Sequence, residues 1–170
     1  MKKLLLLLLC VPLLVFSQNS DRVLEIKKMR KECKLFGNEK DCKRISTEEI
    51  EHESGKSFKQ YVQKCLYPEG YSKIDFALGN NLEAEYFYKD GKLYLAYIVN
   101  DLGSSMKKFK LYFKSDGDIE KLSVSDYEKG NIRKSEIKDK NEIERIKQSE
   151  LRWLEIAKKE LNKWKNYYYY

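Results

Sequence analysis

The chain of 170 residues carries 34 basic and 27 acidic side chains, a formal net charge of +7, and 42% of its residues are hydrophobic. The basic excess is modest and lacks the dense stripe of lysine and arginine that is typical of nucleic-acid-binding proteins, so we expect no nucleic-acid partner. The length suits one domain with an ordinary hydrophobic core.

The first seventeen residues have the pattern of a secretory signal peptide. A short positive start over residues 1–3 precedes an apolar run over residues 4–16, and a small-residue cleavage site lies between Ser17 and Gln18. The alternative is a retained membrane anchor, but the apolar run is shorter than the roughly 20 residues that cross a bilayer. We predict cleavage after Ser17, a mature domain over residues 18–170 without a stable membrane span, and a secreted or periplasmic location. The lack of an Asn-x-Ser/Thr sequon favours a bacterial source.

Three cysteines follow the leader, and an exported protein can form disulfides. Cys33 and Cys42 close a ten-residue segment, and this pair is our disulfide candidate. Cys65 is then left over, either buried and reduced or the true partner of one of the other two. The cysteines and His52 match no common zinc spacing, so we expect no metal site, and no cofactor motif is present.

The first predicted element of the mature domain is a helix over residues 20–36. Ser20 is a candidate N-cap, and Gly37 fits the position just beyond the C-terminus. Apolar side chains recur on one helix face every three or four residues, at Val23, Ile26, Met29, Cys33 and Phe36. Residues 38–57 are polar without a clear period, and we assign a short strand near residues 43–50.

A β-meander is predicted over about residues 58–126, because the apolar period changes to two. Its strongest signal is Asp90-Gly91 between two alternating runs, which predicts a hairpin with a type I′ turn. The two-residue loop implies a register with four core pairs. These pairs are Tyr88–Leu93, Tyr86–Leu95, Ala84–Tyr97 and Leu82–Val99.

A second hairpin is predicted after a loop at Asn100–Met106, and it turns at Asp116-Gly117. Its expected core pairs are Leu111–Leu122 and Phe109–Val124. The pattern of residues 86–93 recurs at residues 112–119, twenty-six positions later. Two copies are too few for a solenoid, so we interpret them as neighbouring hairpins of one meander.

In the C-terminal part, residues 127–141 are polar and read as a linker or a ragged strand end. A long amphipathic helix is predicted over about residues 142–164. The inner stripe of this helix comprises Ile143, Ile146, Glu150, Trp153, Leu154, Ala157, Leu161 and Trp164. The tyrosines of residues 167–170 are either a frayed tail or a contact segment. The predicted fold is α+β, an antiparallel β-meander of about five or six strands with an N-terminal and a long C-terminal amphipathic helix packed on the sheet.

Three stretches resemble a group of uncharacterised secreted or periplasmic bacterial proteins. Those proteins pair an N-terminal IRKEF-like helix with repeated EYYFDNGKLFFVF-like hairpins. The matching stretches are Ile26–Glu32, Glu85–Tyr97 and Lys110–Ile119. The resemblance implies export and a sheet of hairpins, and it implies no activity and no functional residue.

The sequence contains no catalytic constellation that we recognise. There is no G-x-S-x-G elbow and no phosphate-binding loop. His52, between Glu51 and Glu53, is either a general base or a solvated surface residue. Glu83 and Glu85 share a strand face at a spacing that glycosidases use, although outward-facing glutamates are ordinary on a sheet. We therefore expect a protein that is not an enzyme.

The aromatic residues Phe87, Tyr94 and Tyr112 are expected on the face opposite the main core. If this row is exposed, it can bind a protein or glycan partner; if a helix covers it, the row is core. Lysines 107, 108, 110 and 114 form a basic strip that either engages an anionic glycan or lipid or is simply solvated.

The functional expectation is an exported, non-enzymatic binding protein of the periplasm or envelope. The alternative is an inhibitor of a secreted hydrolase that acts through the hairpin loop Asn100–Met106.

Overall fold

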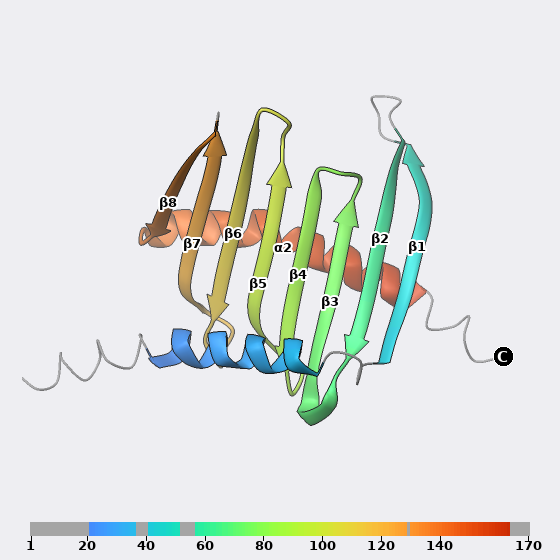
Figure 1. Ribbon diagram of the computed structural model, residues 1–170, viewed down its shortest axis with the longest axis horizontal. Coiled ribbons are helices and arrows are strands. Elements are labelled where there is room, and N and C mark those ends of the chain that lie inside the picture. The colour runs from blue at the N-terminus through green and yellow to red at the C-terminus, as the bar shows by residue number, and fades with distance from the viewer. Residues whose placement is uncertain (1–20, 37–40, 52–56, 129, 164–170) are drawn as a thin grey trace, which may run out of the picture.

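The computed structural model describes residues 21–36, 41–51, 57–128 and 130–163, and for residues 43–51, 57 and 58 it describes the backbone alone. Eight antiparallel strands form one sheet in chain order, with a helix at each end of the chain (Figure 1). The predicted α+β meander with two packed helices is confirmed, and the sheet has eight strands rather than five or six. The predicted signal peptide, His52 and the tyrosine tail lie outside the described residues.

The elements follow one another with short connections. The N-terminal helix covers residues 21–35 and a 3₁₀ turn, η1, covers Pro68–Gly70. The long C-terminal helix, α2, covers Lys140–Lys163. The strands are β1 (Asp41–Glu51), β2 (Ser57–Leu66), β3 (Tyr71–Leu78), β4 (Leu82–Lys89), β5 (Lys92–Asp101), β6 (Ser105–Phe113), β7 (Ile119–Glu128) and β8 (Asn131–Ile137).

The strand assigned near residues 43–50 is confirmed as β1. Of the two alternatives for residues 127–141, the linker is wrong, and the strand end accounts for only part of the segment. This segment contains the end of β7 and all of β8. Strand β8 is an edge strand in which residues 131–136 are exposed, so no apolar alternation marks it in the sequence. Its charged side chains are typical of an edge strand that is protected against further pairing.

The two helices pack on opposite faces of the sheet, and both run across the strands (Figure 1). Helix α2 buries Ile146, Leu154 and Ala157 against the apolar face of β2 to β7, which we call the α2 face. The N-terminal helix buries Ile26 and Cys33 against the other face, which we call the second face. None of the described helices is long and apolar enough to cross a membrane.

The first hairpin has the predicted turn but not the predicted register. Asp90 and Gly91 both have positive φ (49° and 76°), as a type I′ turn requires, and Tyr88 pairs with Leu93. A bulge then makes Tyr94 an extra residue, so Phe87 pairs with Leu95 and each later partner shifts by one. The predicted pairs Tyr86–Leu95, Ala84–Tyr97 and Leu82–Val99 are therefore wrong. The observed partners are Ala96 for Tyr86, Ile98 for Ala84 and Asn100 for Leu82.

The bulge is tolerated because both registers place apolar side chains on the α2 face. In the observed register Tyr94 and Leu95 both lie under the N-terminal helix, and Ala96 and Ile98 turn to the α2 face. The second hairpin has its bulge at Glu120, which is the position equivalent to Tyr94 in the 26-residue repeat. Its predicted core pairs Leu111–Leu122 and Phe109–Val124 are confirmed.

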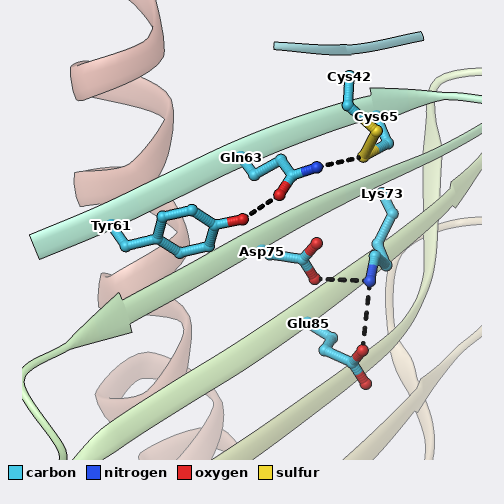
Figure 2. Close-up of a disulfide and its surroundings, with 7 residues drawn as sticks. All are labelled: Cys42, Tyr61, Gln63, Cys65, Lys73, Asp75 and Glu85. Atoms are coloured by element: carbon cyan, nitrogen blue, oxygen red, sulfur yellow. Dashed lines mark hydrogen bonds and ion pairs between the residues drawn. A yellow bond between two sulfur atoms is a disulfide. The ribbon is translucent and has the colours of Figure 1, made fainter. Parts of the chain in front are cut away.

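A disulfide joins Cys42 and Cys65, which face each other directly across β1 and β2 (Figure 2). The predicted pairing of Cys33 with Cys42 is wrong, and the alternative in which Cys65 is a partner is the one observed. Cys33 is a buried free thiol, because its place on the inner stripe of the N-terminal helix turns it toward the sheet. Burial raises the pKa of this thiol.

Candidate functional site

The aromatic row that was predicted as a binding surface is core. Phe87, Tyr94 and Tyr112 are only 1%, 2% and 8% exposed, because the inner stripe of the N-terminal helix packs on them. Tyr94 stacks at a tilt on Phe87, with ring centroids 6.2 Å apart. Alternation placed these side chains on the correct face, but only the position of the helix decides that they are covered. As long as the helix is docked, they cannot contact a partner.

The N-terminal helix covers one end of the second face and leaves the rest of it open (Figure 1). Two cross-strand rows of side chains lie next to the helix in this uncovered area, from β2 to β8, and we call them the open face. The first row comprises Gln63, Asp75, Glu85, Tyr97, Lys110, Ser123 and Glu136. The second row comprises Tyr61, Ala77, Glu83, Val99, Lys108, Ser125 and Lys134. All fourteen side chains are half-buried or exposed.

The open face is acidic at β3 and β4 and basic at β6, whereas β8 contributes one amine, Lys134, and one carboxylate, Glu136. Directly opposed residues of antiparallel strands lie on the same face, so this order of charges follows from the strand register. Tyr97 and Val99 of β5 separate the two sides. A partner that crosses the strands would therefore meet the carboxylates of β3 and β4, then an aromatic and an aliphatic side chain, and then the amines of β6.

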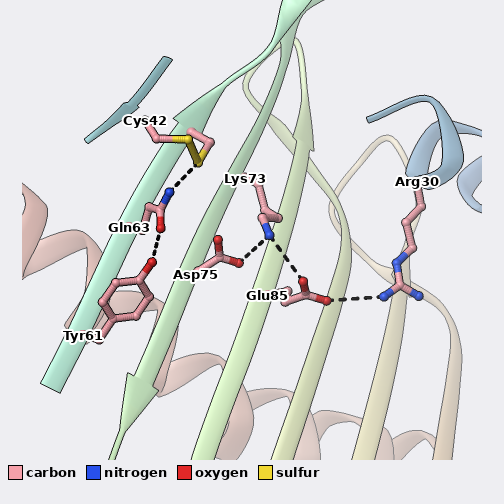
Figure 3. A network of polar contacts seen from close by, with 8 residues as sticks. Arg30, Cys42, Tyr61, Gln63, Lys73, Asp75 and Glu85 are labelled. Atoms are coloured by element: carbon pink, nitrogen blue, oxygen red, sulfur yellow. Dashed lines mark hydrogen bonds and ion pairs between the residues drawn. A yellow bond between two sulfur atoms is a disulfide. The ribbon is translucent and has the colours of Figure 1, made fainter. Parts of the chain in front are cut away.

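A chain of ion pairs crosses the acidic side (Figure 3). The Lys73 Nζ atom lies 2.8 Å from Asp75 Oδ1 and 3.3 Å from Glu85 Oε1, and Arg30 Nη2 of the N-terminal helix lies 3.3 Å from Glu85 Oε2. Burial alone would lower the pKa of Lys73, but its hydrogen bond to Asp75 and the two carboxylate charges outweigh burial and raise it. Both acids are thus neutralised by neighbouring cations.

A second polar chain connects the open face to the disulfide (Figure 2). The Tyr61 hydroxyl donates to Gln63 Oε1, and Gln63 Nε2 donates to Cys65 Sγ at 3.1 Å. These three side chains follow one another on one face of β2 at a spacing of two residues. The disulfide therefore supports the position of Gln63 at the edge of the open face.

The acidic side contains a shallow depression of about 470 Å³. The open-face residues that line it are Tyr61, Asp75, Ala77, Glu83, Glu85, Tyr97 and Val99. The glutamate pair singled out in the sequence, Glu83 and Glu85, thus lines this depression. Glu85 is already ion-paired to Arg30 and Lys73, and no group of three or more potential metal ligands occurs among the described residues.

The basic strip predicted at residues 107–114 is divided between surfaces. Lys108 and Lys110 lie on the open face, where Lys108 Nζ is 4.7 Å from the ring centroid of Tyr127 and Lys110 Nζ is 5.6 Å from that of Tyr97. Lys107 points to the α2 face and pairs with Asp126, at 3.9 Å between Nζ and Oδ2. Lys114 is exposed in the turn after β6. Successive side chains of a strand point to opposite faces of the sheet, so these lysines do not form one continuous strip.

Tyr97 is the residue of the open face that sequence reasoning missed. The predicted register paired it with Ala84 in the core, whereas the bulge at Tyr94 places it opposite Glu85 and between Arg30 and Lys110. One signal was available in the sequence: Glu120, at the equivalent position of the second repeat, is a charged residue where a core strand residue is expected. An extra residue at this position in both copies accounts for that charge.

Comparison with family models, with curated proteins and with solved structures finds no match to this chain. The resemblance of its hairpins to secreted or periplasmic proteins therefore stays a prediction. The open face is the feature of the molecule from which a function can be inferred.

Proposed function

We propose that this chain is an exported, non-enzymatic binding protein of the periplasm or envelope, and that the open face contacts a protein or glycan partner. Export is inferred from the leader sequence. Because the aromatic row is buried, we place the proposed contact surface on the two rows beside it.

The observation that carries this proposal is the composition of the uncovered rows. Tyr61, Tyr97 and Val99 are half-buried at the surface, and charged side chains lie on both sides of them. Binding surfaces commonly combine aromatic anchors with surrounding polar groups. The apolar stripes of both helices pack elsewhere, and the N-terminal helix reaches this group through Arg30, whose Cζ atom lies 5.4 Å from the centroid of the Tyr97 ring.

The test compares a site variant with a matched surface variant of the mature protein. Tyr97→Ser/Val99→Ser removes apolar area from the open face, and Leu24→Ser/Leu35→Ser removes it from the outer side of the N-terminal helix, where the leucines are 60% and 83% exposed. We expect the site variant to lose, by about tenfold or more, partners that wild type captures from envelope and medium. The Leu24/Leu35 variant should retain them.

Thermal unfolding of both variants controls for folding. Equal capture by wild type and by a folded Tyr97/Val99 variant would show that the open face is not the contact surface.

A hydrolase inhibitor is the alternative, and one observation favours it. Leu102 is 70% exposed at the tip of the β5–β6 hairpin, where Gly103 N–H donates to Asp101 Oδ1 at 2.8 Å. The predicted loop Asn100–Met106 is wrong in length, however, because both of its ends belong to strands and only residues 102–104 connect them. The test measures whether the protein inhibits hydrolases secreted by its source. Inhibition by wild type that is lost in Leu102→Asp and retained in Tyr97→Ser would favour this alternative.

A further inference from the structure

We propose that the basic side of the open face binds an acidic glycan, a sugar polymer that carries carboxylate groups. This inference rests on the proposed function, because it names the partner of the same surface. The residues that carry it are Lys108, Lys110 and Lys134 on the strands and Lys27 on the N-terminal helix.

The first argument is the balance of charge. On the acidic side Asp75 and Glu85 are paired with Lys73 and Arg30. On the basic side, no carboxylate of the described residues lies within 4.0 Å of an amine of this group: Lys27, Lys108, Lys110 and Lys134. Of the other two carboxylates of the open face, Glu136 is paired with Lys121, and Glu83 lies on the acidic side. The unpaired charge of the basic side is therefore positive, and a partner that complements it is an anion.

The second argument is the environment of Lys110. Burial lowers the pKa of this amine, and the positive charges of Arg30, Lys134, Lys27 and Lys108 lower it further. The ammonium form is thus held beside four other cations at an energetic cost. A carboxylate bound among them would remove part of the mutual repulsion, and this gain is available only to an anionic ligand.

The third argument is the mixture of groups around the amines. Ser125 lies between Lys108 and Lys134 in the second row, and Ser123 lies beside Lys110 in the first. These hydroxyls can both donate and accept hydrogen bonds, as a sugar with several hydroxyl groups requires. Tyr97 adds an aromatic ring at the centre of the open face, with a flat apolar surface and a polar end.

Dimensions favour a slender chain over a lipid bilayer. The N-terminal helix lies on the same face and stands about 10 Å above the strands, since that is the usual diameter of a helix with its side chains. A flat bilayer would meet the helix first and remain above the strand-borne lysines. A polymer can lie beside the helix, and the distance from β5 to β8 is about 14 Å, which exceeds one small sugar.

The experiment measures binding of the mature protein to an alginate hexasaccharide by calorimetry, with a neutral maltohexaose as the uncharged probe. Lys108→Gln/Lys110→Gln/Lys134→Gln removes the strand amines. Lys64→Gln/Lys140→Gln/Lys159→Gln is the matched control, because it removes the same charge from exposed lysines of the α2 face and of α2 itself, away from the open face.

We expect wild type to bind alginate and not maltohexaose, with affinity falling as salt rises. The open-face variant should bind at least about tenfold more weakly, because charge-assisted contacts are lost, and the control should stay within about twofold. Absence of alginate binding by wild type would overturn the inference, and so would equal weakening by both variants.

Binding to vesicles of phosphatidylglycerol and phosphatidylcholine, or to single-stranded DNA, without binding to alginate would also overturn it. These failures are distinct from failure of the proposed function. A partner that is lost with Tyr97→Ser/Val99→Ser but kept by the lysine variant would leave the open face as a binding surface for a different ligand.

Discussion

Glu150 is a carboxyl group buried in the layer between α2 and the sheet. It is 7% exposed and accepts hydrogen bonds from Asn100 Nδ2 of β5 at 3.0 Å and from Ser149 Oγ at 3.3 Å. Burial raises the pKa of this carboxyl, and the hydrogen bonds from Asn100 and Ser149 and the charge of Arg152 only partly oppose the rise. The helical period placed Glu150 on the inner stripe, but its partner on β5 is a tertiary contact.

Glu150→Gln should therefore change the pH dependence of stability. In the folded state the carboxyl holds its proton more tightly than in the unfolded state, so wild type loses stability as pH rises through the unfolded pKa toward the raised folded pKa. The glutamine keeps an acceptor for Asn100 and has no proton to lose. We expect equal free energies of unfolding for both proteins near pH 4 and a more stable variant at pH 7, measured by urea denaturation.

A wild-type protein that is as stable as the variant at both pH values would contradict this account of Glu150. The matched control is Glu142→Gln, which alters an exposed carboxyl in the first turn of the same helix.

At the scale of elements, the hairpins show which features of a strand pair the local sequence pattern can predict. Asp90-Gly91 predicted the turn and its backbone conformation correctly, because positive φ at both positions is a local requirement. The bulge at Tyr94 was not predictable from alternation, since residues 93–99 are apolar on both faces. Where both faces are apolar, the pattern does not distinguish a register from its one-residue shift.

The cross-strand disulfide of the β1–β2 pair gives a prediction at the same scale. The bond encloses a segment with a sequence separation of 23 residues, for which loop-closure entropy predicts a stabilisation of about 3 kcal/mol. Dithiothreitol should lower the free energy of unfolding of wild type by about that amount, and it should leave Cys42→Ser/Cys65→Ser unchanged.

Peptide mapping of the denatured, alkylated protein identifies the free thiol, which we expect at Cys33 alone among Cys33, Cys42 and Cys65. A free thiol at Cys65 would restore the pairing of Cys33 with Cys42 and contradict the structure.

At the scale of the whole molecule, the open face exists because the N-terminal helix is narrow relative to the strands. A helix about 10 Å wide that runs across the sheet covers about three residues of each strand, whereas β5 and β7 have ten residues each. The ion pair of Arg30 with Glu85 attaches the helix at the boundary of the open face. The Tyr71 hydroxyl donates to Glu32 Oε2 at 2.6 Å and attaches the helix near the start of β3, away from the open face. Undocking of this helix would expose the aromatic row, and it would also move Arg30 away from Glu85 and Tyr97.

The two layers should differ in stability. The N-terminal helix buries Ile26 and Cys33, while α2 contributes a larger apolar stripe to the main cluster. We expect Ile26→Asp to undock the helix, because it places a charge where the side chain is fully buried. Hydrogen exchange should accelerate in residues 21–36 while β4 to β6 and α2 remain protected.

Leu24→Asp on the outer side of the same helix is the matched control and should leave exchange unchanged, since Leu24 is 60% exposed. Global loss of protection in Ile26→Asp would show instead that the helix and the sheet unfold as one unit.

The sequence by itself determined what depends on neighbours along the chain: the two amphipathic helices, the turns, the alternation in the strands and the α+β class. The tertiary structure alone decided the one-residue shift at Tyr94, the pairing of Cys42 with Cys65 and the face that each helix covers. The tertiary structure also decided that residues 131–137 form the edge strand β8, because these residues have no buried stripe that would predict a strand. The reason is physical: periodicity records which side of an element is apolar, whereas the partner of that side is chosen by contacts between residues far apart in the chain.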